Sequence, residues 1–157
     1  MFKTVYGVEK KPVTLTGHWY IKLYGAEGEI KQELSGKNVI TENGLDFIAS
    51  FFNSAATAAA TFTMRYVAIG TDATAEAASN TALGAETGRI SGIVGYTSSA
   101  IYTVTATFPS GTGTGAIVEY ALFSSSTGGT MLSRDTESVI NKGANDTLEV
   151  TTEITMS

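Results

Sequence analysis

The chain has 157 residues, a formal net charge of −5 and a pI near 4.8, and it contains no cysteine. This length fits one domain with its own core, and the lack of cysteine excludes a disulfide framework and a thiolate metal site. The acidic balance, with only ten Lys and Arg, argues against binding nucleic acid through its phosphates. Its 24 threonines favour a mainly β protein, because β-branched side chains suit a pleated surface.

Residues 1–12 hold three of the ten Lys and Arg, two aromatic residues and Pro12, without periodicity. We interpret them as an N-terminal arm; a frayed terminus is the default expectation, and docking on a neighbouring subunit is the functional alternative. The predicted contact residues are Phe2, Lys3, Tyr6, Val8, Lys10 and Lys11. No signal-peptide pattern and no apolar run of membrane-spanning length are present, so we expect a soluble protein made in the cytoplasm, without a membrane partner.

Apolar and polar residues alternate from Val13 to Tyr24, with Trp19 on the apolar face, which predicts a long half-buried strand. Turn residues at 25–28 and a polar strand at 29–34 complete a hairpin. The sequence then predicts a short helix whose N-cap is Asn43, with Asp46 at the third helical position. The spacing places these residues on its apolar face: Leu45, Ile48, Ala49 and Phe52.

Further strands are predicted at 65–69, 90–96, 100–108, 116–124, 131–140 and 147–156. Residues 53–61 and the alanine-rich stretch 73–80 are interpreted as surface loops, and Gly111–Gly115 as a flexible turn that lacks the lysine of a phosphate-binding loop. The resulting fold prediction is one antiparallel β-sandwich or jelly-roll-like domain over residues 13–157, with about eight strands and one short helix.

Few residues point to chemistry. The only histidine, His18, lies on the polar face of a strand, where neither a catalytic triad nor a histidine metal site can form. Glu119 and Glu137 are the carboxylates to inspect as an acid–base pair, but a strand carboxylate bonded to backbone or to Arg89 or Arg134 is the favoured interpretation.

Oxygen ligands for calcium are available at Asp72, Asn80 and Glu86, although they lack the spacing of a known calcium loop. We therefore assign no catalytic residue, cofactor or metal, and predict a protein that is not an enzyme.

A succession of short blocks resembles a broad group of small virion proteins of tailed phages, which includes capsid decoration proteins and modules of tail fibres or tail tips. Each block alone is weak, and their order over most of the chain carries the resemblance. The blocks are Gly36–Leu45, Tyr66–Thr71, Asn80–Glu86, Glu119–Phe123, Gly129–Arg134 and Val139–Leu148.

The resemblance implies a structural protein of the virion. Within that group we expect a capsid cement, or decoration, protein on the outer surface of the head, which binds the major capsid protein and itself, as a homotrimer. A tail-fibre or tail-tip module is the alternative. A glycan-binding β-sandwich is a third interpretation, but Trp19, Tyr20 and Tyr24 lie on a regular strand, where core or interface packing is the expected role.

Overall fold

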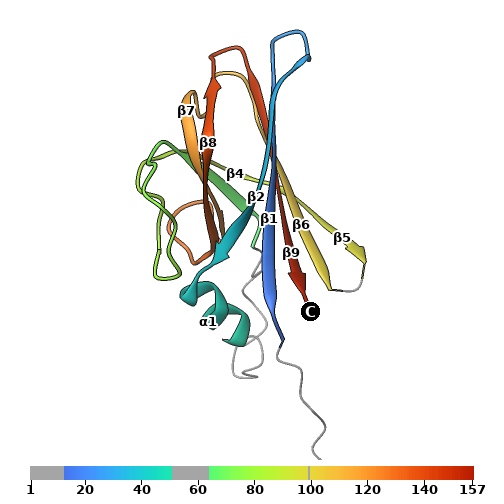
Figure 1. Cartoon of the computed structure of the whole chain (residues 1–157), viewed down its shortest axis with the longest axis vertical. Coiled ribbons are helices and arrows are strands. Elements are labelled where there is room, and N and C mark those ends of the chain that lie inside the picture. Colours follow the sequence, from blue (N-terminus) through green and yellow to red (C-terminus); the bar gives the residue numbers. More distant parts are fainter. Residues whose placement is uncertain (1–12, 51–63, 99) are drawn as a thin grey trace, which may run out of the picture.

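The computed structural model describes residues 13–50, 64–98 and 100–157, with the backbone alone at 96–98. Within these ranges the chain forms nine strands, all paired antiparallel, and one helix (Figure 1). The elements are β1 (Leu15–Tyr24), β2 (Ile30–Ile40), α1 (Glu42–Ser50), β3 (Tyr66–Gly70), β4 (Glu86–Ser91), β5 (Ile93–Ser98), β6 (Ile101–Phe108), β7 (Gly115–Phe123), β8 (Met131–Lys142) and β9 (Thr147–Met156).

The described strands form one sheet in the order β4-β3-β7-β8-β2-β1-β9-β6-β5, which folds round a common core. We call β5, β6, β9, β1 and β2 the open half and β4, β3, β7 and β8 the covered half. The long strand β2 joins the halves, because it pairs with β1 along most of its length and with β8 at Val39 and Ile40. On the other side β4 runs into β5, so the sheet is nearly closed (Figure 1).

The core lies between the two halves. The predicted alternation of β1 is confirmed: Trp19, Ile21 and Leu23 are buried, whereas the residues between them face outward. Trp19 meets Tyr120 of the opposite half, with ring centroids 6.2 Å apart. The alternations predicted for 100–108 and 147–156 are also confirmed, because both strands turn their apolar residues into this core.

The single strand predicted at 90–96 is wrong. Residues 86–98 form two strands, β4 and β5, which lie at opposite edges of the sheet and meet at the buried Gly92. A Cβ at this position would lie 2.9 Å from the Thr105 carbonyl oxygen and would overlap Val104, so only glycine fits the bend. Nine described strands therefore replace the expected eight.

The predicted N-cap of the helix is wrong, and of its predicted apolar face Ile48 packs on the core whereas Leu45 and Ala49 are exposed. Helix α1 begins at Glu42, and Thr41 caps it: its Oγ1 accepts the N–H of Gly44 at 3.0 Å and donates to the Met131 carbonyl at 2.5 Å. This start places Gly44, Phe47 and Ile48 toward the core, whereas Leu45 is 44% exposed. Phe52 lies outside the described residues.

The mainly β, antiparallel fold with a short helix is thus confirmed for the described residues, whereas the jelly-roll or two-sheet sandwich arrangement is not. Hydrogen bonds through β2 connect the two halves into one sheet, and a sequence pattern does not reveal such a connection. The predicted arm at residues 1–12 and the loop at 53–61 lie outside the described residues.

Candidate functional site

The outer face of the covered half is closed by residues 71–85, which we call the cover loop. Leu83 of this loop packs on a second apolar cluster formed by Ala68, Ala121, Phe123 and Met131. The backbone N–H of Glu42 donates to the Ala78 carbonyl at 2.8 Å, which ties the loop to the start of α1. The alanine-rich stretch predicted as a long loop is therefore a fixed part of the structure.

A buried carboxylate holds the two ends of this loop. Glu119 is fully buried, and its oxygens accept the backbone N–H groups of Gly84 at 2.9 Å, Ala85 at 2.8 Å and Asp72 at 3.2 Å. Arg134 Nη2 donates to the same carboxylate at 2.9 Å. The charge of Glu119 is thus paired and bonded, as a buried carboxylate requires.

Arg134 uses its other donors on the middle of the loop. Its Nη1 donates to Asn80 Oδ1 at 3.0 Å and its Nη2 to the Thr74 carbonyl at 3.0 Å. The structural interpretation of Glu119, with Arg134 as partner, is confirmed. Arg89, the other predicted partner, pairs with Glu86 at 2.6 Å and lies 3.6 Å from the ring centroid of Phe123.

The three candidate calcium ligands have separate partners. Asp72 accepts the backbone N–H and the hydroxyl of Thr74, and these hydrogen bonds lower the pKa of its carboxyl. Asn80 contacts Arg134, and Glu86 contacts Arg89. Among the described residues no cluster of three or more histidine or acidic side chains is placed to hold a metal.

The outer face of the open half has no such cover among the described residues. The strand register places Ile93, Thr105, Thr151, Tyr20 and Ser35 side by side in one row across β5, β6, β9, β1 and β2. We call this the central row. It carries no charge, its Ile93 is 79% exposed, and the Thr105 and Thr151 hydroxyls lie 2.9 Å apart in a hydrogen bond.

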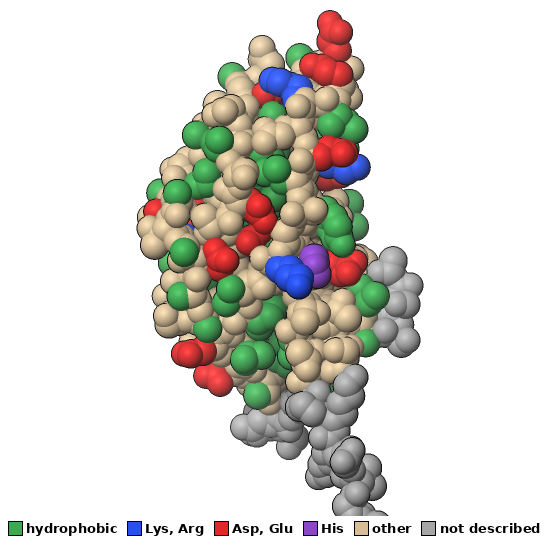
Figure 2. All heavy atoms as spheres, viewed as in Figure 1, with side chains coloured by type: hydrophobic (Ala, Val, Ile, Leu, Met, Phe, Trp, Pro, Cys, Tyr) green, Lys and Arg blue, Asp and Glu red, His purple; other side chains and the backbone are tan. Residues whose placement is uncertain are grey.

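Charged residues stand in the rows on either side. One neighbouring row contains Thr103, Glu153, His18 and Lys37, and the other contains Thr107, Glu149, Lys22 and Glu33. Lys22 and Glu33 pair at 3.2 Å, and this hydrogen bond raises the pKa of Lys22. The space-filling view shows charged side chains scattered among uncharged ones rather than gathered in one patch (Figure 2).

His18 lies in this open face, as the sequence predicts. Its ring stacks with Tyr20, with centroids 6.5 Å apart. Trp19 points the other way and is fully buried. The exposed aromatic surface of β1 is therefore Tyr20 with His18, and the only tryptophan belongs to the core.

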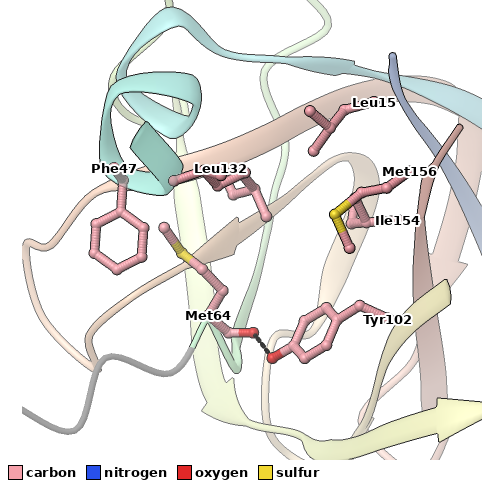
Figure 3. A pocket seen from close by; sticks show the side chains of 8 residues that line it. Leu15, Phe47, Met64, Tyr102, Leu132, Ile154 and Met156 are labelled. Atoms are coloured by element: carbon pink, nitrogen blue, oxygen red, sulfur yellow. Dashed lines mark hydrogen bonds between the residues drawn. The ribbon is translucent and has the colours of Figure 1, made fainter. Parts of the chain in front are cut away.

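A pocket of about 280 Å³ opens at the end of the core beside α1 (Figure 3). The Tyr102 hydroxyl donates to the Met64 carbonyl at its rim, at 2.6 Å. Its described lining is apolar apart from that hydroxyl, which gives it no acid–base or metal-binding group. The lining residues are Leu15, Phe47, Ile48, Met64, Tyr102, Leu132, Ile154 and Met156.

Asp135 and Asp146 are buried acids that the sequence interpretation missed, and Asp135 is the less exposed of the two. Asp135 is only 2% exposed and lies opposite Tyr120 in the β7–β8 register. Glu137, a predicted candidate, is on the same strand, and both carboxyl groups lie against Gly36 of β2. The alternation Asp135-Thr136-Glu137 in a strand was the available signal, because residues two apart share a face.

Comparison with protein-family models, with curated proteins and with solved structures gave no match. In the described ranges, no helix has the length and hydropathy needed to cross a membrane.

Proposed function

We propose that this chain is a non-catalytic structural protein of a tailed-phage virion, and within that class a capsid cement protein. The observation that carries the proposal is the open, uncharged central row, which stands opposite a face that the chain covers with its own loop. A partner can bury such a row without desolvating an unpaired charge, which is the costly step in forming an interface.

The size of the open face suits a specific protein interface. Five strands at about 4.8 Å spacing and about 3.3 Å per residue give a surface of about 24 by 33 Å, or about 800 Å². A standard protein–protein interface buries about 800 Å² on each partner. The face, its charged flanking rows included, is thus wide enough for a stable contact with a capsid subunit, with the uncharged central row in the middle of that contact.

The blocks that resemble phage virion proteins contain the residues that fix the fold. The blocks include three residues that hold the cover loop in place, namely Glu119, Arg134 and Gly84. They also include the helix cap Thr41. The five residues of the central row fall outside every block. The resemblance therefore supports a shared scaffold, and the choice between head and tail depends on what the open face binds.

In the cement proposal the open face lies on the major capsid protein, and the arm reaches a neighbour. The predicted arm contacts, Phe2, Lys3, Tyr6, Val8, Lys10 and Lys11, lie outside the described residues. We propose a homotrimer, because a threefold assembly matches the threefold positions of an icosahedral shell. Several weak contacts would then add through avidity.

A tail-fibre or tail-tip module remains the alternative, because the same resemblance includes such proteins. The copy number in purified particles separates the two, measured by quantitative mass spectrometry against the major capsid protein. A ratio near one or one third is the result expected of cement. A few copies per particle would assign the chain to the tail, and absence from particles would refute both.

A glycan-binding role has less support. Trp19, the strongest candidate platform, is fully buried, and the Tyr20 and His18 rings stack on each other within the sheet face. No loop in the described part of the chain brings an exposed aromatic ring together with converging carboxylates, which a sugar site requires.

A further inference from the structure

The joint between β2 and β8 has fewer paired residues than any other between neighbouring strands in the described sheet. Only Val39–Arg134 and Ile40–Ser133 pair across it, whereas β1 and β9 pair at ten positions. Elsewhere along this joint, Gln32 Nε2 donates to the Val139 carbonyl at 3.1 Å. We call the remainder of the joint, residues 30–38 of β2 against 135–142 of β8, the seam.

Two carboxyl groups of β8 meet β2 at the seam. A Cβ built on Gly36 would overlap the Glu137 carboxylate and would lie 3.4 Å from Asp135 Oδ2. Both acids therefore occupy the space that the missing side chain of Gly36 leaves. Gly36 is in register with Trp19 of β1, so this space borders the core.

The Asp135 carboxylate receives a hydrogen bond from the Thr136 backbone, but only one of its two oxygens is satisfied. Its Oδ2 has no hydrogen-bond partner in the described part of the chain, and the same holds for the buried Tyr120 hydroxyl. A buried carboxylate left in this state is costly, whereas a protonated carboxyl can donate to a neighbouring oxygen. The Glu137 carboxyl is the neighbour within reach, and a bond between two carboxyl groups requires a proton on one of them.

The charges that face Asp135 are all negative or neutral. Glu137 on its own strand and Glu76 of the cover loop act on it, β7 contributes the Tyr120 hydroxyl, and β2 contributes Gly36. The cations nearby in sequence are used elsewhere: Arg134 bonds Glu119 under the cover loop, and Lys37 belongs to a row of the open face. Burial, and then the charge of Glu137, raise the pKa of Asp135 to about 7.

We propose that Asp135 and Glu137 share one proton across the seam, and that release of this proton in mildly alkaline solution loosens the β2–β8 joint. Release leaves two negative charges side by side with no facing cation among the described groups. Only two residue pairs of the β2–β8 ladder hold the two strands together against this repulsion. The pairing of β2 with β8 at the edge of the core thus depends on this proton, and we call the Asp135–Glu137 pair the latch.

The direction of the pH effect follows from the raised pKa. The folded chain binds the proton more tightly than the unfolded chain, whose aspartate titrates at about 3.9. The stabilising effect of the protonated pair is fully present below about pH 4 and is lost as the pH rises through about 7. The contribution of this pair to stability therefore falls across this window.

The first test compares urea unfolding of the wild type and Asp135→Asn from pH 4 to 8.5, with Trp19 fluorescence as the probe because it is the only tryptophan. Across this range the unfolding constant of the wild type should rise relative to that of the variant, by up to about a thousandfold for a shift of three pH units. Asp46→Asn, on an exposed position of α1, is the matched control and should follow the wild type.

Parallel curves for the wild type and Asp135→Asn would overturn the proposal. If the variant does not fold, an NMR titration of side-chain carboxyl carbons in the wild type replaces it. A carboxyl titrating near pH 7, accompanied by faster amide exchange in residues 30–40 above that pH, is expected. A midpoint near 4 for the Asp135 carboxyl, or exchange that does not change with pH beyond its intrinsic dependence, would refute the latch.

Discussion

Replacing Glu119 by glutamine tests the lock that holds the cover loop. The wild-type carboxylate accepts four hydrogen bonds, three from backbone N–H groups and one from Arg134. Glutamine keeps the shape of the side chain but has only one acceptor oxygen. Its NH2 group replaces the other oxygen and points N–H donors at the N–H donors that the carboxylate accepts in the wild type. The substitution also leaves the Arg134 guanidinium buried without its counter-charge, since the Arg134 side chain is 3% exposed.

The expected cost is large because both partners are buried. Removing one partner of a buried ion pair typically costs about 3–5 kcal/mol. Urea unfolding at pH 7 should show a loss of this size, and hydrogen exchange should show residues 71–85 losing protection first. Combining Glu119→Gln with Arg134→Gln should cost less than the sum of the two single changes, because no unpaired charge then remains.

Glu86→Gln is the matched control. It breaks the Arg89–Glu86 pair, in which the Glu86 side chain is 34% exposed, and partly exposed pairs of this kind contribute about 0–1 kcal/mol. A Glu119→Gln protein within about 1 kcal/mol of the wild type, with residues 71–85 still protected, would refute the lock.

Three further changes test other parts of the structure. Thr41→Val removes the helix cap and the bond to the Met131 carbonyl, and should lower the free energy of unfolding by about 1–2 kcal/mol in urea titrations; an unchanged midpoint would contradict this role. Gly44→Ala places a methyl group 2.7 Å from the Leu132 backbone. This clash should lower the melting temperature, although alanine has the better helix propensity. A higher melting temperature would contradict the prediction. Hydrogen bonds from Lys31 and from the Gly143 N–H lower the pKa of Asp146. The wild type should therefore have a larger free energy of unfolding than Asp146→Asn at pH 7, and this difference should fade below about pH 4. A difference that persists at pH 2 would contradict the prediction.

Local patterns predicted much of the sheet. Alternation located β1, β6 and β9 and the faces they bury, because one side of each strand packs on the core and the other does not. The chemistry of a buried carboxylate was sufficient to propose a structural pairing of Glu119 with Arg89 or Arg134, and the structure shows Arg134 as the partner.

Long-range register was beyond such patterns. The bend at Gly92 depends on its approach to Thr105, and the cap at Thr41 on its bond to β8; both are tertiary contacts. The central row joins residues as distant as Ser35 and Thr151, which no spacing along the chain brings together. For Asp135 the alternation with Glu137 indicated a shared face, but that this face is buried depends on contacts with other strands, such as Gly36 of β2.

The central claim is that the open face binds a capsid surface. Particles that lack this chain, incubated with purified protein, allow bound copies per major capsid protein to be counted for the wild type and for Ile93→Lys, which puts a charge in the central row. Val139→Lys, which also replaces an exposed apolar residue but on β8, is the control. Wild-type occupancy for Val139→Lys with a clear loss for Ile93→Lys is the predicted result, whereas equal occupancy for all three proteins would contradict the claim.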